Sequence, residues 1–479
     1  MAKIKIYLFR VLGLATSLIW TALFSTYSLS ETSEQSIWDN HQASSYWTPV
    51  ASPSAVLQKN SQNVSMQNGI EVSLNLPQIQ KLLPSSNKRG RTEVIIYFPN
   101  LHGEMIAFAV KEKSNFSPVL AAKFPEINAY VGVAVDDPGQ KIHFSAAPSG
   151  LEAVISSNTS GRVNIEKIKG TSNYRISDNH EGHHDHGSFT CSTQFKAQSN
   201  DFKDLLTNAK MSPAIVKKSS FSNASTLSKY RLAVSANGQY TQYHGGTIAG
   251  ALAGINATMT NVNAIYERDF GITLQLIDNN DSIIYTDIAT DPYTDSTNSM
   301  NSELQRNLDD VIGIDNYDHG HLFSSITGFG MSGNAGAIGG FCNDQTKGSA
   351  WSDSARPEGS DFTFLVAHEM GHQIGANHTF SMRSEGTGKN VEPGSGTTVM
   401  SYAGITGGND VAIASDNYFH HVSIEQSLNY LQSQSCHVDE SNENSLPVID
   451  DIRDVSIPIL TPFILTGIAI DADQNDVLS

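Results

Sequence analysis

The stretch from His368 to His378 holds the residues whose types and spacing could do chemistry. It reads His-Glu-Met-Gly-His-Gln-Ile-Gly-Ala-Asn-His. On a helix, His368 and His372 lie four residues apart, so both imidazoles leave the same face and can bind one Zn²⁺. Gly375 can adopt a positive φ, which would end the helix and return His378 as a third ligand. Three protein ligands leave the fourth position open for water, which is typical of a catalytic zinc site.

A glutamate and a downstream methionine accompany the three histidines. Glu369 lies next to where a zinc-bound water would sit, so we predict that it is the general base. The alternative is a surface helix with solvated His and Glu side chains, but the extended spacing argues against chance. The motif H-E-x-x-H-x-x-G-x-x-H resembles that of the metzincin metalloproteases. These enzymes also carry a downstream methionine turn, which Met400 fits, although an ordinary core methionine is the alternative.

Composition and length limit the class of protein. The chain has 479 residues, enough for about two to four domains with large cores. With 30 Lys and Arg against 48 Asp and Glu, the net charge is −18. This acidic balance argues against nucleic acid or an anionic membrane as a partner and favours a soluble, extracellular protein.

The N-terminus has the pattern of an export signal. Lys3, Lys5 and Arg10 precede a mostly apolar run from Val11 to Phe24, and small residues follow. We therefore predict a signal peptide over residues 1–30 and secretion, with surface attachment left open. An uncleaved membrane anchor is the alternative, but the apolar run is short for one, and no later stretch approaches a membrane span.

The cysteine count predicts one disulfide and one free thiol. Cys191, Cys342 and Cys436 are the three cysteines, an odd number for an exported protein. Cys342 and Cys436 flank the zinc motif and are the natural pair. A separate explanation is needed for Cys191.

Residues 31–228 form a first segment of β character. Its apolar or alternating runs predict strands at 93–98, 105–110, 130–135 and 141–144. A His-rich linker follows at 178–187, which could bind stray metal but is better explained as a solvated linker. Residues 196–228 then have the composition of a connector, with Lys217-Lys218 as a candidate cleavage point.

Residues 229–439 form a second segment in which strands alternate with helices. Strands are expected at 230–235, 272–277 and 320–326, and helices at 247–266, 303–312 and 423–432. Asp361 is a candidate N-cap for the helix that carries His368. From 445 to 479 the pattern resembles the start of an immunoglobulin-like or cadherin-like β-sandwich, which we expect to be incomplete. Its acidic residues could bind Ca²⁺: Asp471, Asp473 and Asp476.

Residues 229–437 resemble the secreted bacterial branch of the reprolysin-like, or adamalysin-like, metalloproteases. The resemblance rests on the zinc motif, on Tyr230–Val234, on Asp318–Ser324 and on Met400–Gly404. It implies an α/β catalytic domain, with a twisted, mostly parallel sheet, helices and zinc in a cleft between two lobes. An edge strand would bind extended peptide substrates, so the resemblance implies a zinc-dependent endopeptidase that acts on extracellular proteins.

The resemblance also has departures and extensions. Animal adamalysins have an acidic residue after the third histidine, where this chain has Thr379. Tyr402, two residues after the methionine, could ligate zinc and assist the oxyanion as in astacins and serralysins, or could simply pack below the metal. Residues 118–125 resemble the propeptide of such proteases, which implies a zymogen. Cys191 would then bind the zinc as an inhibitory thiolate, or else be a free or intermolecularly paired thiol.

Two other function classes are weighed against the protease. An adhesive or binding protein could use the same scaffold, but such relatives usually lose the glutamate or a zinc histidine, and all four residues are present. The other function class is a metal hydrolase that acts on a non-peptide amide or ester. Little in the sequence favours it. We therefore predict a secreted zinc endopeptidase inhibited by its own propeptide.

Overall fold

The computed structural model describes most of the chain between residues 46 and 473. The described residues are 46–50, 69–84, 93–157, 161–178, 189–193, 226–326, 328, 330–441, 445, 447–450, 456–458, 461–462, 464 and 466–473. The predicted signal peptide, Asp476, Lys217-Lys218 and the histidines of the His-rich linker lie outside these residues.

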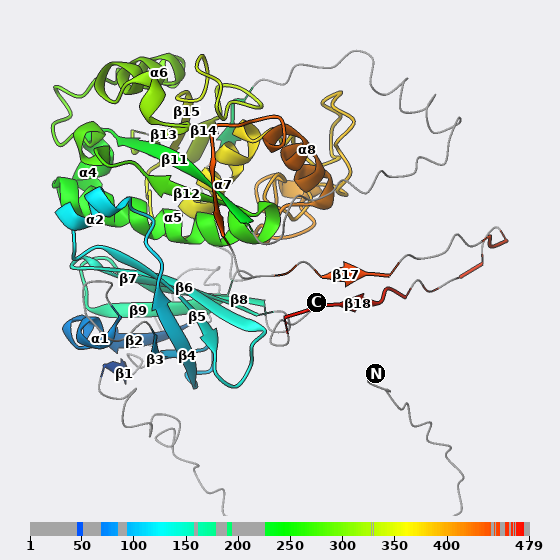
Figure 1. Ribbon diagram of the computed structural model, residues 1–479, viewed down its shortest axis with the longest axis horizontal. Helices are drawn as coiled ribbons and strands as arrows, with labels where there is room; N and C mark the ends of the chain where they lie inside the picture. The colour runs from blue at the N-terminus through cyan, green and yellow to red at the C-terminus, as the bar shows by residue number, and fades with distance from the viewer. Residues whose placement is uncertain are drawn as a thin grey trace, which may run out of the picture. The chain divides into compact units, whose positions relative to one another are not determined.

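The first part of the described chain forms an antiparallel sheet of nine strands, here called the N-terminal sheet (Figure 1). Its strand order is β1-β2-β9-β8-β7-β6-β5-β4-β3. The strands are β1 (Trp47–Pro49), β2 (Ile70–Leu74), β3 (Val94–Pro99), β4 (Met105–Glu112), β5 (Asn128–Ala134), β6 (Gln140–Ala147), β7 (Gly150–Ser157), β8 (Gly161–Lys167) and β9 (Asn173–Asp178). Two helices accompany them, α1 (Leu76–Leu82) and α2 (Pro118–Lys123). The four strands predicted from the sequence correspond to β3, β4, β5 and β6.

One face of the N-terminal sheet carries its own apolar core. Residues that alternate along the strands are buried there, among them Trp47, Phe98, Phe108, Phe144 and Tyr174. Period-two alternation brings such side chains to the same face of a sheet. The sequence therefore predicts β structure here, and the structure shows a single large antiparallel sheet.

A second, mixed sheet holds the strands of the predicted catalytic segment, in the order β10-β14-β15-β13-β11-β12. Its members are β10 (Phe189–Cys191), β11 (Thr226–Ala236), β12 (Ile272–Leu276), β13 (His319–Ser324), β14 (Met331–Asn334), β15 (Ala350–Ser354) and β16 (Val438–Ser441). Four pairings are parallel, whereas β14 runs antiparallel to β15 and β16 runs antiparallel to β11. The expected mostly parallel sheet is thus a mixed one, with its reversed strand β14 next to the site.

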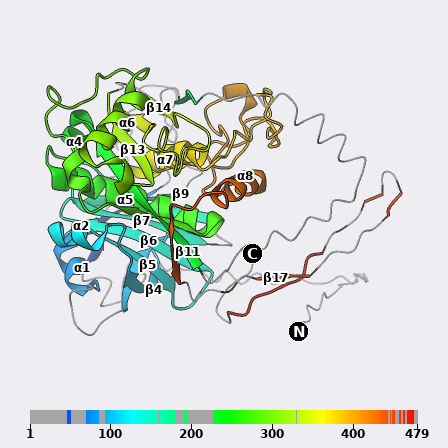
Figure 2. The ribbon, with the colours of Figure 1, turned by 45° about the horizontal axis from the view of Figure 1, so that its top comes forward.

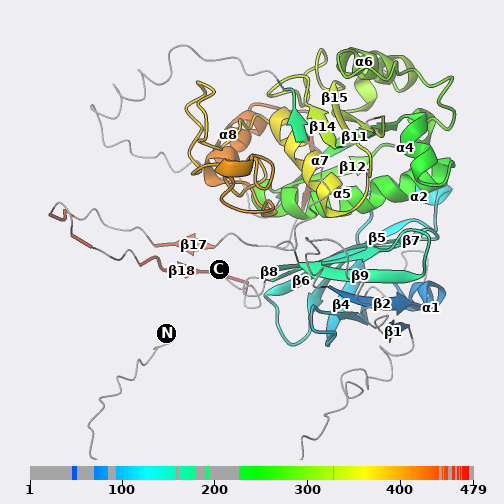
Figure 3. The same ribbon diagram turned by 180° about the vertical axis from the view of Figure 1, so that it is seen from behind.

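Five α-helices complete this part of the described chain, residues 226–441, which we call the catalytic domain after the role predicted from the sequence. They are α4 (Gly238–Tyr243), α5 (Ile248–Phe270), α6 (Met300–Val311), α7 (Gly359–Gln373) and α8 (His421–Leu431). Helix α5 begins after the Thr247 hydroxyl, which accepts from the backbone of Gly250, and ends at Gly271 with φ 67°. Helices α5 and α7 pack against each other (Figure 2), and α7 lies beside β14 and β15 (Figure 3).

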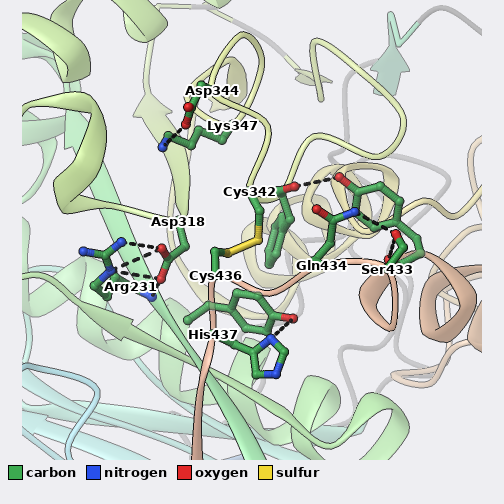
Figure 4. The surroundings of a disulfide bond; sticks show 12 residues. Arg231, Asp318, Cys342, Asp344, Lys347, Ser433, Gln434, Cys436 and His437 are labelled. Atoms are coloured by element: carbon green, nitrogen blue, oxygen red, sulfur yellow. Dashed lines mark hydrogen bonds and ion pairs between the residues drawn. A yellow bond between two sulfur atoms is a disulfide. The ribbon is translucent and has the colours of Figure 1, made fainter.

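A disulfide joins the segment before α7 to the segment after α8. It links Cys342 to Cys436, the pairing expected from the sequence (Figure 4). Beside it, the Arg231 guanidinium donates to the Asp318 carboxylate, with Nη2 2.6 Å from Oδ1. The disulfide thus ties the end of the catalytic domain to the segment between β14 and β15, and the ion pair ties β11 to the residue before β13.

The C-terminal described residues contain one short strand pair. Strand β17 (Val448–Ile449) lies antiparallel to β18 (Ala469–Ile470). This pairing does not test the predicted β-sandwich, which stays a prediction, as does calcium binding. In the described part of the chain, no helix is long and apolar enough to cross a membrane.

Candidate metal centre

Helix α7 and the turn after it position the three histidines of the motif. His368 and His372 leave the same buried face of α7, and neither is accessible to solvent. The helix ends at Gln373, and Gly375 follows with φ 103°, which an L side chain would not tolerate. The chain then turns and returns His378, also fully buried, toward the other two rings. Asp361 lies in the first turn of α7 and is not its N-cap, because Glu358 holds that position.

Each histidine is oriented by a contact of its Nδ1 nitrogen. His368 Nδ1 lies 2.7 Å from the Val399 carbonyl, and His372 Nδ1 lies 2.7 Å from the Ala376 carbonyl. His378 Nδ1 lies 3.1 Å from the Glu385 carboxylate. Carbonyl and carboxylate oxygens can only accept, so in each case Nδ1 carries the proton and Nε2 presents its lone pair.

The three Nε2 atoms converge on one point. His378 Nε2 lies 3.1 Å from that of His368 and 3.2 Å from that of His372. Burial lowers the pKa of His368 to about 4 and holds the pKa of the other two imidazoles well below its ordinary value, so the rings are neutral. Three lone pairs that face one another repel unless a cation lies among them. The residues therefore fit a zinc ion held by His368, His372 and His378.

A segment far upstream brings a fourth donor to this point. Strand β10 runs parallel to β14, with Cys191 opposite Gly333. The Cys191 Sγ lies 3.5 Å from His372 Nε2 and 3.7 Å from a Glu369 oxygen, Oε2. All four metal-binding atoms lie within 4.8 Å of one another. Burial and the nearby Glu369 raise the pKa of the thiol, so a cation in the centre would be needed to hold the thiolate.

Two further residues of the same segment face the site. Because strand side chains alternate, Phe189 and Thr193 point to the same side as Cys191. Thr193 Oγ1 donates to Glu369 Oε2 at 3.1 Å and accepts from the backbone of Ala335 at 2.9 Å. The Phe189 ring lies edge-on to His368, with centroids 5.6 Å apart. The segment from Phe189 to Thr193 therefore covers both the histidines and the predicted general base.

Glu369 lies against β14 because Gly333 has no side chain. A Cβ on Gly333 would lie 2.4 Å from Glu369 Oε1. The carboxyl group is fully buried, and burial raises its pKa to about 8, although hydrogen bonds from Cys191 and Thr193 oppose the shift. A carboxyl group whose pKa is raised toward neutrality suits a general base.

The turn that contains Met400 packs against α7, the helix that carries His368 and His372. The Met400 sulfur contacts α7 at Gly371, where a Cβ would lie only 2.6 Å from Sδ. The Glu392 carboxylate is buried and accepts from both the backbone and the hydroxyl of Thr398. Val399, the acceptor for His368, follows directly. An acidic residue, Glu392, thus anchors this turn.

Comparison with known families agrees with this geometry. Residues 226–431 match the family model described as metallo-peptidase family M12B, reprolysin-like. This part of the chain is a reprolysin-like metallopeptidase domain. The match runs from β11 to the end of α8 and includes the three histidines, Glu369 and Met400. A search of curated proteins gave no match.

In the reprolysin-like domain, the ring of Tyr402 packs among the histidines. Its centroid lies 4.7 Å from that of His378, 4.6 Å from that of Phe380 and 5.4 Å from that of Phe189. Burial raises the pKa of the Tyr402 hydroxyl, which therefore stays protonated. The Tyr402 ring therefore packs against His378, Phe380 and Phe189. Zinc ligation by its hydroxyl and a contact of that hydroxyl with substrate both stay predictions.

Sequence reasoning missed four residues of this site: Thr193, Gly333, Glu385 and Glu392. Only Thr193 has a signal in the sequence, because it follows Cys191 by two residues, the spacing that brings side chains to one face of an extended chain. Gly333 contacts Glu369, Glu385 contacts His378, and Glu392 accepts from Thr398 in the Met400 turn. These contacts depend on loops and strands whose positions no local pattern reveals.

Proposed function

We propose that the chain is a secreted zinc-dependent endopeptidase made as a zymogen. The convergence of the three neutral Nε2 atoms beside Glu369 carries this proposal. The family of the catalytic domain supports a peptidase, and the export-signal pattern over residues 1–30 supports secretion. The substrates proposed are extracellular proteins or peptides.

The chain's own residues divide the work of peptide hydrolysis. A zinc ion held by His368, His372 and His378 would supply Lewis acidity to the scissile carbonyl and make water more acidic. Glu369 takes a proton from the attacking water and passes it to the leaving amine nitrogen. The Glu385 carboxylate and the two backbone carbonyls hold the histidine rings in place. Tyr402 is proposed to donate from its hydroxyl to the developing oxyanion.

Latency is proposed to reside in the segment from Phe189 to Thr193. Cys191 would supply a thiolate to a metal ion held by the histidines, and Thr193 donates to the Glu369 oxygen that would accept the proton. The thiolate would occupy the fourth ligand position of the metal, and Thr193 occupies the Glu369 oxygen. Neither water nor a substrate carbonyl could then approach the metal beside Glu369. Activation then requires that this segment leave β14.

The test compares three forms of the full chain: unaltered, Cys191→Ser, and Cys191→Ser with Glu369→Gln. Zinc content and casein hydrolysis are measured on the same samples. We expect about one zinc per chain in all three forms, because three histidines suffice to hold the ion. Hydrolysis should be low in the unaltered chain, higher in Cys191→Ser and lost in the double variant or with a chelator.

Each outcome has a distinct meaning. A chain without zinc would overturn the metal assignment. Zinc with full activity in the Glu369→Gln background would overturn the general base. An unaltered chain as active as Cys191→Ser would remove the latency proposal and leave the peptidase intact.

A further inference from the structure

Besides the segment from Phe189 to Thr193, the chain upstream of the catalytic domain contacts that domain at a second place, on α5 and β12. Residues 115–117 come after β4 and lie along β12, the edge strand of the mixed sheet. Phe116 bridges to Leu276 in parallel register. The Ser117 amide donates to the Leu276 carbonyl at 2.9 Å, and the Leu276 amide donates to the Asn115 carbonyl at 2.8 Å. A piece of the N-terminal segment thus extends the catalytic sheet by main-chain pairing.

A buried amide network lies beside this pairing. The Asn115 side-chain amide donates to Thr260 Oγ1 at 2.8 Å and to Asn256 Oδ1 at 3.1 Å. Asn115 Oδ1 accepts from Asn263 at 3.0 Å, and Asn263 also donates to the Leu274 carbonyl at 2.9 Å. All four polar side chains are buried. Without Asn115, several buried polar groups of α5 would lose their partners, which is costly away from water.

Apolar contacts surround the network. Phe116, Leu120, Ile127 and Ala147 belong to the same buried cluster as the core of the catalytic domain. Strands β5 and β6 pack against α5. Two ion pairs lie at the margin, Lys113 with Glu267 and Lys123 with Asp281, and both lysines are partly exposed. The contact surface between the N-terminal segment and α5 therefore has a buried centre, made of apolar side chains and the amide network. Ion pairs surround that centre.

A third contact reaches the active-site helix itself. Glu166 of β8 accepts from the backbone amide of Ser360 at 2.9 Å, in the first turn of α7. Glu358, at the N-cap position, makes no capping hydrogen bond with its own side chain. The N-terminal sheet thus supplies an anionic partner to the start of the helix that carries the zinc motif.

We propose that α5 and the β12 edge form a binding site that retains the N-terminal sheet after the chain is cut between residues 193 and 226. The proposal rests on the proposed zymogen, because it concerns the state of the protein after cleavage. Its contacts involve neither the histidines nor Cys191. Cutting the connector alone therefore yields a non-covalent complex in which the segment from Phe189 to Thr193 can remain on β14. Activation then needs a second event that separates the two parts.

The test uses the full chain carrying Glu369→Gln, so that it cannot digest itself, with a site-specific protease sequence placed at 217–218. After the cut, size-exclusion chromatography with light scattering tracks both fragments over a dilution series. A chelator and the Cys191→Ser variant remove the contact at the metal centre. We expect the fragments to co-elute in all these conditions.

Two variants locate the binding site. Asn115→Leu should weaken the complex about 100-fold, because it leaves buried amides on α5 unpaired. Lys113→Glu places two acidic groups together and should weaken it about fivefold, and adding Glu267→Lys should restore it. Thermal unfolding of the uncut chains shows whether each variant is folded. If Asn115→Leu fails to fold, the weaker complex of Lys113→Glu and its recovery with Glu267→Lys still test the proposal.

Several results would overturn the proposal. Fragments that separate as soon as the chain is cut would show that α5 and β12 do not retain the N-terminal sheet. Fragments that separate only with the chelator or in the Cys191→Ser variant would show that the metal centre alone holds them. Retention unchanged in both Asn115→Leu and Lys113→Glu would place the binding site elsewhere. No activity is measured, so these outcomes are independent of whether the peptidase assignment is right.

Discussion

The Nδ1 nitrogen of His378 lies 3.1 Å from the Oε2 atom of Glu385, seven residues farther along the chain. The other two histidines of the centre donate instead to neutral backbone carbonyls. Burial raises the pKa of Glu385, and Arg383, 3.7 Å away, opposes the shift. A carboxylate beside a ligand histidine increases the basicity of the ring and holds its orientation. His378 is therefore the ligand that depends most on a single side chain.

Glu385→Gln should weaken zinc binding about 10-fold to 100-fold, because it removes the negative charge behind His378. Competition with a chromogenic chelator measures the zinc dissociation constant. Glu425→Gln is the matched control, since Glu425 is exposed on α8 and lies outside the site. Equal zinc affinity in Glu385→Gln and the control would show that the carboxylate does not tune the centre.

Gly333→Ala should lower kcat while leaving zinc bound. The new Cβ would lie 2.4 Å from Glu369 Oε1 and 2.6 Å from its Cδ, so the carboxylate must move. A displaced general base typically costs about 100-fold or more in rate. The comparison is made in the Cys191→Ser background. Gly408→Ala is the control, because a Cβ there meets nothing within 4 Å. Unchanged kcat in Gly333→Ala would show that Glu369 need not hold this position.

Tyr402→Phe separates the packing of the ring from the chemistry of its hydroxyl. The ring contacts with His378 and Phe380 are kept, so stability and zinc content should change little. If the hydroxyl stabilises the oxyanion, kcat should fall about 10-fold to 1,000-fold with little change in KM. A kcat within twofold of the unaltered enzyme would assign Tyr402 a packing role only.

His321→Gln should reduce the loss of stability in acid. Burial lowers the pKa of His321 to about 3, whereas the unfolded chain binds the proton near pH 6.5. The unfolded state therefore holds more protons between these values, and stability present above pH 6.5 is lost as the pH falls toward 3. This one group contributes a slope of about 1.4 kcal/mol per pH unit.

Urea unfolding at several pH values between 6.5 and 4.5 measures that slope. Glutamine does not titrate and can keep a hydrogen bond to the Ser352 hydroxyl, which lies 2.9 Å from His321 Nε2. In the variant, the slope of unfolding free energy against pH should decrease by about 1.4 kcal/mol per pH unit, which corresponds to one proton. This holds whatever the stability of the variant at neutral pH. An identical slope in both chains would mean that His321 does not carry the acid sensitivity.

Local patterns determined much of this protein from the sequence alone. Helical periodicity brings His368 and His372 to one face, and the conformational freedom of Gly375 permits the turn that returns His378. Short apolar or alternating runs likewise marked strands β3 to β6. These inferences succeed because each depends on residues within a few positions of one another.

Only the tertiary structure decided which distant residues meet. The position of Cys191 and Thr193 at the site depends on the pairing of β10 with β14, and the length and composition of the intervening segment do not specify that pairing. Gly333, Glu385 and Asn115 have ordinary sequence surroundings, and their roles arise from groups packed against them. Sheet order and loop paths depend on the summed burial of many side chains, so no local pattern identifies such partners.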